Sequence, residues 1–237
     1  MTGSSEKRQR PPFVHRVMRG IDNLRFAMGE IGDNFHEHNP NSELNMQLGH
    51  FAIARTEGFY SAEQSKLLQQ FVLDHPNITK IAEMGFNSGH TANTFLGARE
   101  DVEVTSFSHR KRRNSKEAQL FINENYPHRH TMVKGNSLFT VPKYFGSDEK
   151  FDLIYIDRGH QKNIAYADMY NGAKIASPEC FVIMDDVPST RFWIPGQEEA
   201  WTQFSDAGNI VELDRVESGN RRWVIGQYSP KFIGQVS

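Results

Sequence analysis

The sequence has little of three features that would each place it in a special class of protein. It has a single cysteine, Cys180, so an intramolecular disulfide is excluded. No apolar run approaches the roughly 20 residues of a membrane-spanning helix, and the N-terminal residues lack the apolar core of a secretory signal. The 27 basic and 29 acidic side chains leave a net charge of -2, which argues against a generally basic nucleic-acid coat. We therefore expect a cytoplasmic protein without a membrane anchor, and a buried structural thiol at Cys180.

The chain divides into three parts by composition. Residues 1–12 are polar and basic and end in two prolines, which is typical of a disordered tail. Residues 13–60 have apolar side chains at roughly helical spacing and predict one or two short helices that form a lid or a dimer contact. Within that part, residues 34–45 are rich in asparagine and histidine and predict a loop. Residues 61–230 have the regular pattern of the main domain.

Short apolar runs alternate with amphipathic stretches through residues 61–230. A capping pattern predicts a helix from residue 61 to about residue 75. The sequence then predicts five strands at 78–84, 102–107, 130–135, 151–157 and 180–186, with helices at 89–98, 115–125, 137–145 and 161–176. A helix around Trp201 precedes two last strands, at 210–216 and 222–228, joined by a tight turn. We predict a doubly wound α/β fold with a mostly parallel seven-stranded sheet, covered by helices on both faces and closed by an antiparallel hairpin.

The first predicted strand ends in a loop that suits a bound cofactor. Its sequence is Glu83-Met84-Gly85-Phe86-Asn87-Ser88-Gly89, followed by a helix. Glycines allow the backbone to turn tightly and let a ligand approach the start of a helix. The spacing differs from the G-x-G-x-x-G of dinucleotide-binding folds. With its acidic residue before the first glycine, the loop resembles the cofactor loop of class I S-adenosylmethionine-dependent methyltransferases, and the resemblance extends over residues 61–230.

This resemblance implies a Rossmann-like methyltransferase fold and a set of cofactor-binding residues. In the family, the glycine loop surrounds the amino-acid part of S-adenosylmethionine, an acid after the second strand binds the ribose, and a turn after the third strand meets the adenine. The implied residues in this chain are Glu83, Gly85, Asn87, Ser88, Gly89, Ser108, Asn136, Ser137 and Asp157. Ser108 stands where the family has the acid, and its hydroxyl accepts one hydrogen bond from a ribose rather than two.

Three aspartates follow two neighbouring predicted strands. Asp157 ends the fourth strand, and Asp185 and Asp186 end the fifth. The carboxyl ends of parallel strands lie at one edge of a sheet, where ligands bind. Three close carboxylates repel one another unless a divalent cation with a preference for oxygen, such as Mg²⁺, lies between them. The alternative is that these aspartates only cap the loops and helices that follow.

The spacing of the acids and of His160, three residues after Asp157, resembles the metal-dependent O-methyltransferases of the catechol and macrolide-sugar types. The resemblance implies that Asp157, Asp185 and Asp186 bind the metal and that His160 is the general base. It predicts methyl transfer to a hydroxyl of a small molecule such as a sugar, a catechol or a natural-product diol. We expect other histidines, including His128 and His130, to be structural.

Some features leave alternatives open. The basic run at residues 109–113 suits a solvated helix start, a nucleic-acid or nuclear-localisation patch, or, together with Ser108, a pocket for the 2′-phosphate of NADP. Residues 192–196 suit a pocket wall or ordinary core. The alternative functions are a methyltransferase for a nitrogen or a nucleic acid, and a non-catalytic small-molecule-binding protein. We expect a small-molecule substrate, no nucleic-acid or membrane partner, and a homodimer as one oligomeric state open to the chain.

Overall fold

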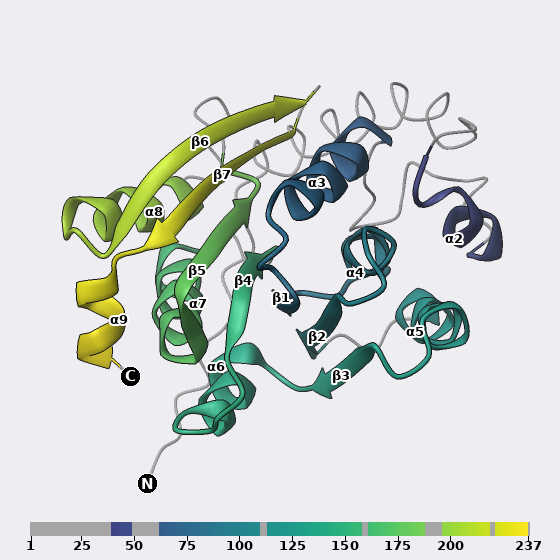
Figure 1. Cartoon of the computed structure of the whole chain (residues 1–237), viewed down its shortest axis with the longest axis horizontal. Coiled ribbons are helices and arrows are strands. Elements are labelled where there is room, and N and C mark those ends of the chain that lie inside the picture. Colours follow the sequence, from purple (N-terminus) through teal and green to yellow (C-terminus); the bar gives the residue numbers. More distant parts are fainter. Residues whose placement is uncertain are drawn as a thin grey trace, which may run out of the picture.

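Seven strands form one sheet at the centre of the molecule (Figure 1). The structure is a computed structural model, and it describes residues 39–48, 62–109, 113–157, 161–187, 196–218 and 221–236. The strands are β1 (Lys80–Met84), β2 (Glu103–Ser108), β3 (His130–Lys134), β4 (Phe151–Ile156), β5 (Ala176–Asp185), β6 (Ile210–Ser218) and β7 (Arg221–Tyr228). Their order is β3-β2-β1-β4-β5-β7-β6. The first five are parallel, and β7 pairs antiparallel with both β5 and β6, which confirms the doubly wound fold and its closing hairpin.

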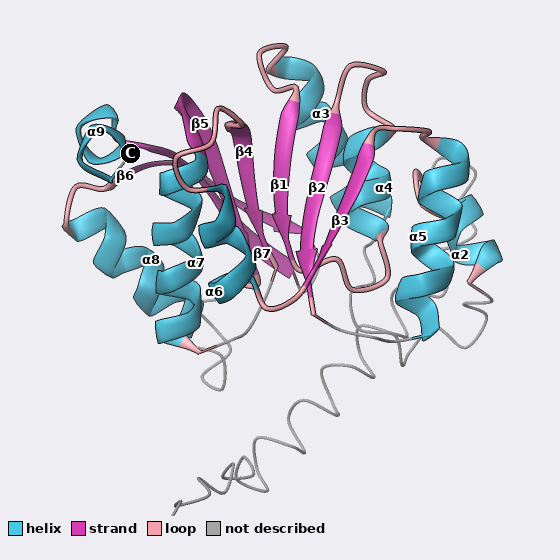
Figure 2. Cartoon of the chain, turned by 90° about the horizontal axis from the view of Figure 1, so that it is seen from below, coloured by secondary structure: helices cyan, strands magenta, loops and turns pink. Residues whose placement is uncertain are grey.

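Helices cover both faces of this sheet (Figure 2). The helices are α2 (Ser42–Gln47), α3 (Ala62–Asp74), α4 (His90–Leu96), α5 (Arg113–Asn125), α6 (Ser137–Thr140), α7 (Lys162–Ile175), α8 (Gly196–Asp206) and α9 (Pro230–Val236), with a 3₁₀ turn η2 (Val141–Tyr144). Helices α2 to α5 lie on one face, and α6 to α9 lie on the other.

The core consists of two apolar clusters, one on each face of the sheet. Alternate residues of a strand point to opposite faces, so Ile81 belongs to the cluster under α3 and α4, and Ala82 belongs to the cluster under α7. In β4, Leu153 and Ile154 divide in the same way. Because both faces are buried, the strands are continuous apolar runs, which is why the sequence pattern located them. Cys180 is fully buried, as expected, and burial raises the pKa of its thiol.

The structure differs from the sequence expectations at element ends. The helix expected over 137–145 ends at Thr140 and continues as the 3₁₀ turn, because Pro142 has no N–H group to donate. Strand β5 begins at Ala176 rather than at Cys180. Helix α9 was not expected; its buried Phe232, Ile233 and Val236 pack on the same core as α7 and α8.

A short helix lies within the stretch that the sequence predicts to be a loop. Helix α2 begins at Ser42, inside residues 34–45, and its Leu44 is buried in the cluster under α3 and α4. The expectation of a loop is therefore wrong for residues 42–45, because Leu44 has a place in the core that a polar local sequence does not reveal. The tail at 1–12 and most of the segment at 13–60 lie outside the described residues.

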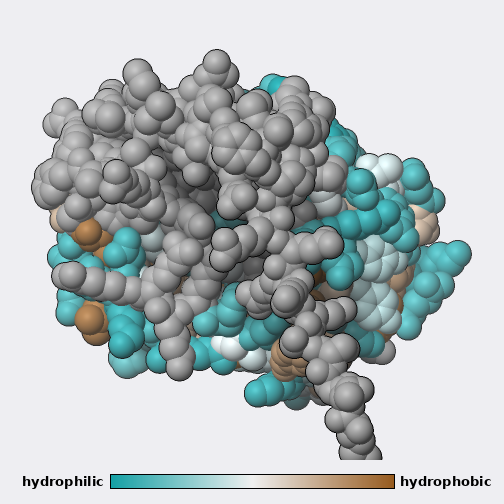
Figure 3. Space-filling model, turned by 180° about the vertical axis from the view of Figure 1, so that it is seen from behind, coloured by the Kyte–Doolittle hydropathy of each residue, from teal (hydrophilic) through white to brown (hydrophobic). Residues whose placement is uncertain are grey.

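The described surface is largely polar. On the face in Figure 3, the coloured residues are mostly hydrophilic, with small separate hydrophobic areas. The large hydrophobic side chains that are exposed are spread over α2, α3, α5, α6, α7 and β6: Met46, Leu67, Leu73, Leu120, Phe139, Tyr170, Val211 and Leu213. Within the described parts of the chain, no helix combines the length and the apolar character that a membrane crossing requires.

We expect Gly172→Ala to destabilise the protein by about 1–2 kcal/mol. An alanine normally stabilises a helix relative to glycine. In α7, however, the added Cβ would lie 2.8 Å from the hydroxyl oxygen of Tyr228 and 2.9 Å from Cγ2 of Ile154. The free energy of unfolding, measured by urea denaturation, should therefore fall.

The matched control is Gly234→Ala in α9, where an added Cβ meets nothing within 4 Å. This variant should be as stable as the wild type or about 0.5 kcal/mol more stable. Equal effects of the two substitutions would contradict the close approach of α7 to the sheet.

Candidate functional site

The loop between β1 and α4 has a backbone that few residue types adopt. Gly85, Asn87 and Gly89 have positive φ angles of 119°, 45° and 78°. Glycine and asparagine tolerate this region better than other residues. At Gly89 a Cβ atom would also lie 3.0 Å from the Cβ of Ala118 and 3.0 Å from Cζ of Phe86. The loop therefore follows one tight course close to α5.

Hydrogen bonds hold this loop at the carboxyl edge of the sheet. The N–H of Gly85 donates to the carbonyl of Phe107 in β2 at 3.1 Å, and the Ser115 hydroxyl of α5 donates to the carbonyl of Asn87 at 2.6 Å. The Asn87 amide donates to Oδ2 of Asp157 at 3.0 Å. Asp157 directly follows β4, so this bond connects the ends of β1 and β4, the two strands between which the sheet order reverses.

Glu83 does not reach the open edge of the sheet. Its side chain is 0% exposed, and the Ser106 hydroxyl of β2 donates to its Oε2 at 2.5 Å. Burial raises the pKa of this carboxyl from 4.5 to about 8, although the Ser106 hydroxyl and the Ala92 N–H lower it in part. Glu83, expected to bind the cofactor, is thus held between β2 and the first turn of α4.

His130 extends this buried polar group. Its Nε2 lies 2.9 Å from the Ser106 hydroxyl oxygen, and its ring stacks on Phe86 of the glycine loop with centroids 5.3 Å apart. Because the Ser106 hydroxyl already donates to Glu83, Nε2 is the donor in this contact. Burial lowers the pKa of His130 to about 4, which keeps the ring neutral. His130 is therefore structural, as expected, but sequence reasoning did not identify Ser106 and His130 as the support of the loop.

The residues after β2 and β3 are close through their backbones. The carbonyl of Ser108 accepts from the N–H of Gly135 at 3.0 Å, so the two turns lie side by side. The side-chain oxygen of Asn136 accepts from the N–H of Leu138 at 3.0 Å and caps α6. Ser108 is half-buried, at the position where the family resemblance implies a ribose contact.

Two further expected cofactor residues, Ser137 and Ser88, are buried like Glu83. Ser137 is 0% exposed, and its hydroxyl donates to Oδ1 of Asp168 in α7 at 2.6 Å. The Ser137 hydroxyl therefore joins α6 to α7 instead of pointing to the sheet edge. Ser88 is also buried, in the glycine loop itself.

The two aspartates after β5 have different surroundings. Asp185 is 0% exposed, and its Oδ1 accepts from the N–H of Asp186 at 2.8 Å. Asp186 has a φ of 54°, so the chain turns sharply at this point. The N–H of Val187 then donates to the carbonyl of Arg222 at 3.1 Å, which ties the turn to β7.

These carboxylates do not form the expected metal centre. Asp157, Asp185 and Asp186 all belong to the described residues, and within those residues no group of three or more histidine, cysteine or acidic side chains is arranged to hold a metal ion. The carboxylate of Asp157 is bonded to Asn87, and that of Asp185 to the adjoining backbone. As placed, the three aspartates form no such group, so their convergence on Mg²⁺ stays a prediction. His160 lies outside the described residues.

Other expected features of the site also fall outside the described residues. These are the aromatic stretch before Gly196 and residues 110–112 of the basic run. Of that run, His109 follows β2, and Arg113 is the first residue of α5.

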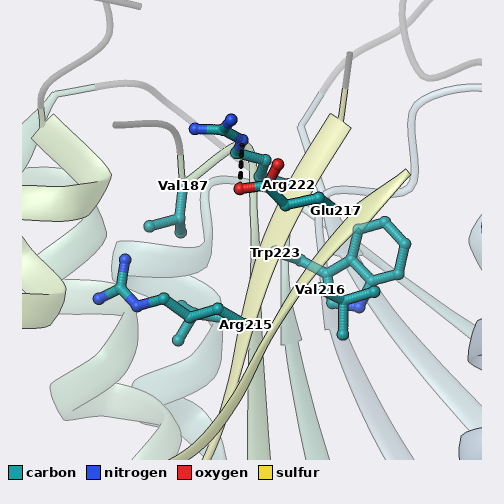
Figure 4. Close-up of a pocket in the computed structure, with 7 residues that line it drawn as sticks. Val187, Arg215, Val216, Glu217, Arg222 and Trp223 are labelled. Carbon is teal, nitrogen blue, oxygen red and sulfur yellow. Dashed lines mark ion pairs between the residues drawn. The ribbon is translucent and has the colours of Figure 1, made fainter. Parts of the chain in front are cut away.

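A small cavity of about 60 Å³ lies beside the end of β5 (Figure 4). It is lined by Val187, Arg215, Val216, Glu217, Arg222, Trp223 and Val224. Its arginines are paired: Arg222 with Glu217 at 3.0 Å, and Arg215 with Glu198 and Glu212. A cavity of this size holds a few waters at most, so it is not the site of a nucleoside cofactor.

The pKa of Glu83 predicts a pH-dependent stability. A carboxyl with a higher pKa in the folded state than in the unfolded chain stabilises the fold in its protonated form, and this contribution is lost as the pH rises towards 8. His130, with its lowered pKa, acts in the opposite direction below pH 6.5. Between pH 6.5 and 8, we expect the free energy of unfolding of the wild type to fall relative to Glu83→Gln by about 1.4 kcal/mol per pH unit.

Urea denaturation at several pH values measures this difference. Glu103→Gln, at the exposed start of β2, is the matched control and should run parallel to the wild type. A constant difference between wild type and Glu83→Gln over this pH range would show that Glu83 ionises normally in the folded protein.

The chain matches one protein-family model, described as a methyltransferase domain, over residues 82–187. This stretch extends from β1 to the turn after β5 and so includes the glycine loop, Ser108, Asn136 and all three aspartates. A search of curated proteins finds no match.

Solved structures share the fold at low identity. An O-methyltransferase of Streptomyces achromogenes involved in tomaymycin synthesis, in complex with SAM, is 15% identical with a TM-score of 0.68, covering 88% of this chain and 99% of its own. An O-methyltransferase of Bacillus cereus in complex with SAH is 17% identical with a TM-score of 0.68, covering 87% and 100%. An SAH-bound methyltransferase of Podospora anserina is 14% identical with a TM-score of 0.63, covering 93% and 99%. Residues 82–187 thus match a methyltransferase domain, and the sheet with its covering helices has the fold of these solved methyltransferases.

Proposed function

We propose that the protein transfers a methyl group from S-adenosylmethionine to a hydroxyl oxygen of a small molecule. The observation that carries the proposal is the hydrogen bond from Asn87 to Asp157, which joins the glycine loop to the end of β4. Strand order reverses between β1 and β4, and open α/β sheets bind their ligands at such a reversal. The match to a methyltransferase domain and the SAM or SAH bound by structural neighbours support this choice of cofactor.

The described residues divide the binding of the cofactor among three turns. We assign its amino-acid part to Gly85, Asn87 and the other residues of the glycine loop, its ribose to Ser108, and its adenine to the turn at Asn136. Glu83 and Ser137 contribute indirectly, because their side chains hold the loop and α6 from within the core. Asp157 accepts a hydrogen bond from the Asn87 amide and so orients the Asn87 side chain.

Methyl transfer needs an oxygen in line with the sulfonium methyl group and a group that takes the hydroxyl proton. We assign the proton to His160, three residues after Asp157, because imidazole titrates near neutral pH. Oxygen acceptors are favoured because two of the similar structures are O-methyltransferases. The bond from sulfur to the methyl carbon breaks as the bond from oxygen to carbon forms, which leaves S-adenosylhomocysteine.

We also propose that methyl transfer uses a divalent cation, and this part of the proposal rests only on the spacing of the three aspartates in the sequence. The three carboxylates as placed do not form its site, so no step of the reaction above depends on it. The residues that would hold it are Asp157, Asp185 and Asp186, and it would lower the pKa of the acceptor hydroxyl.

We expect S-adenosylmethionine to bind the purified protein with a Kd in the micromolar range, with and without EDTA, because the residues assigned to the cofactor bind it without a metal. Isothermal titration calorimetry measures this. Asp157→Asn should weaken binding by about tenfold, since an uncharged amide oxygen is a poorer acceptor for the Asn87 amide.

The matched control is Asp148→Asn, which makes the same chemical change at an exposed position after η2. It should bind the cofactor as the wild type does. Absence of binding to the wild type in both buffers would overturn the proposed function and leave the fold unchanged.

We expect His160→Ala to lower the rate of methyl transfer by about 100-fold or more, with the Kd for S-adenosylmethionine unchanged. Formation of S-adenosylhomocysteine, with a panel of catechols, vicinal diols and sugars as acceptors, measures the rate. His128→Asn is the control, because His128 is exposed with a φ of 66° that asparagine tolerates. An unchanged rate for His160→Ala would show that His160 is not the general base.

Removal of metal ions tests the proposed divalent cation separately from cofactor binding. If the proposed cation assists methyl transfer, EDTA abolishes turnover and Mg²⁺ restores it. Asp186→Asn, which keeps a residue suited to the left-handed backbone, should then require about tenfold more Mg²⁺. Full activity of the wild type in EDTA would show that the carboxylates are structural.

A further inference from the structure

Residues 39–48 are attached to the main domain by buried polar side chains. Asn39, Asn41 and Asn45 are each no more than 4% exposed, although asparagine is usually found at the surface. Of the side chains in α2, Leu44 and Asn45 are the buried ones. The attachment therefore depends on directed hydrogen bonds more than on apolar area.

Asn41 is the centre of the first set of contacts. Its Nδ2 donates to the hydroxyl oxygens of Ser65 in α3 at 2.8 Å and of Thr94 in α4 at 3.0 Å. Its Oδ1 accepts from Nδ2 of Asn93 at 2.9 Å, and Asn93 also donates to the carbonyl of Pro40 at 3.0 Å. One carboxamide thus joins the segment to two helices, with both donors and the acceptor in use.

His90 and Asn45 form the second contact. Nε2 of His90 lies 2.8 Å from Oδ1 of Asn45, and both side chains are buried. A carboxamide oxygen only accepts, so Nε2 of His90 has the proton and donates. His90 is the first residue of α4 and directly follows Gly89, the last glycine of the loop.

Both contacts reach the part of α4 that continues from the cofactor loop. The N–H of Asn93 donates to the carbonyl of Gly89 at 2.9 Å, and the Thr94 hydroxyl donates to the carbonyl of His90 at 2.8 Å. Asn41 and Asn45 therefore hold the same turn of α4 at two points. A displacement of this turn moves Gly89 and, with it, the end of the loop.

We propose that residues 39–48 are a clamp that holds the glycine loop in its cofactor-binding course, with Asn41, Asn45 and His90 as positioning residues. The inference rests on the proposed function, because it takes this loop as the site of S-adenosylmethionine. A loop that is already ordered pays less conformational entropy when the ligand binds. Without the clamp the loop samples other courses, and the Kd of the cofactor rises while the chemistry at His160 is unaffected.

Amide hydrogen exchange of the protein without ligand tests the clamp directly. We expect Asn45→Ala, Asn41→Ala and His90→Ala each to speed exchange in residues 85–94 by about tenfold. His90→Gln, whose Nε2 also donates to Asn45, should restore slow exchange. This readout does not depend on any cofactor, so it separates the clamp from the proposed function.

Calorimetry with S-adenosylmethionine tests the consequence for binding. The three alanine variants should raise the Kd by about tenfold, His90→Gln should recover most of the loss, and turnover at saturating cofactor should stay near that of the wild type. The control is Tyr228→Phe, which also removes one buried hydrogen bond, from the Tyr228 hydroxyl to the carbonyl of Met169, on the other face of the sheet. It should lower the denaturation midpoint without changing the Kd.

The exchange and calorimetry experiments distinguish failure of the clamp from failure of the proposed function. Unchanged exchange in residues 85–94 would overturn the clamp. Faster exchange with an unchanged Kd would overturn the effect of the clamp on cofactor binding. An equal rise in Kd for Tyr228→Phe would show that the alanine variants act only by lowering the overall stability of the fold. A wild type that binds no S-adenosylmethionine would instead overturn the proposed function.

Discussion

The structure around the glycine loop depends on one carboxyl group that is enclosed in the core. Glu83 has no access to solvent, so its charge is costly unless the group is protonated or hydrogen-bonded. The Ser106 hydroxyl, the adjacent His130 ring and the first turn of α4 supply that environment, and Phe86 stacks on the same ring. β1, β2 and the start of α4 are thereby fixed relative to one another below the loop. The residues that face a ligand can then be few and small, because the support lies in the core.

The two sides of the proposed site are built in different ways. On the cofactor side, Glu83 bonds to Ser106 beneath the loop, and buried asparagines of residues 39–48 bond to α4, which continues from the loop. On the acceptor side, the turn after β5 is held by the Asp186 N–H, which donates to the Asp185 carboxylate, and by the main-chain bond from Val187 to Arg222. Only the first of these bonds uses a side chain, so neither bond depends on the side chains of Asp186 and Val187. This separation allows one fold to keep its cofactor while its acceptor changes.

Much of the fold was predictable from the sequence, and the reason is physical. Strands buried on both faces are uninterrupted apolar runs, and helices between them have one apolar side, so β1 to β7 and most helices were located to within a few residues. The positions of polar side chains were not predictable in the same way. Neighbouring residues of a strand point to opposite faces of the sheet. In an apolar run, nothing in the local sequence says whether a polar side chain points into the core or toward the ligand-binding edge. Glu83 pairs in register with Ser106, and only the paired strands reveal that its carboxyl points inward.

The segment around α2 shows the same limit more sharply. Clustered asparagines usually indicate a solvated loop, because their side chains compete with the backbone for hydrogen bonds. Here Asn41 and Asn45 meet partners on α3 and α4 that are distant in the sequence, and the apparent loop becomes a docked element. A polar residue can therefore be buried only where its partners are placed in advance by other elements. The buried asparagines are evidence that α4 has one defined position, which also fixes the end of the glycine loop that continues into α4.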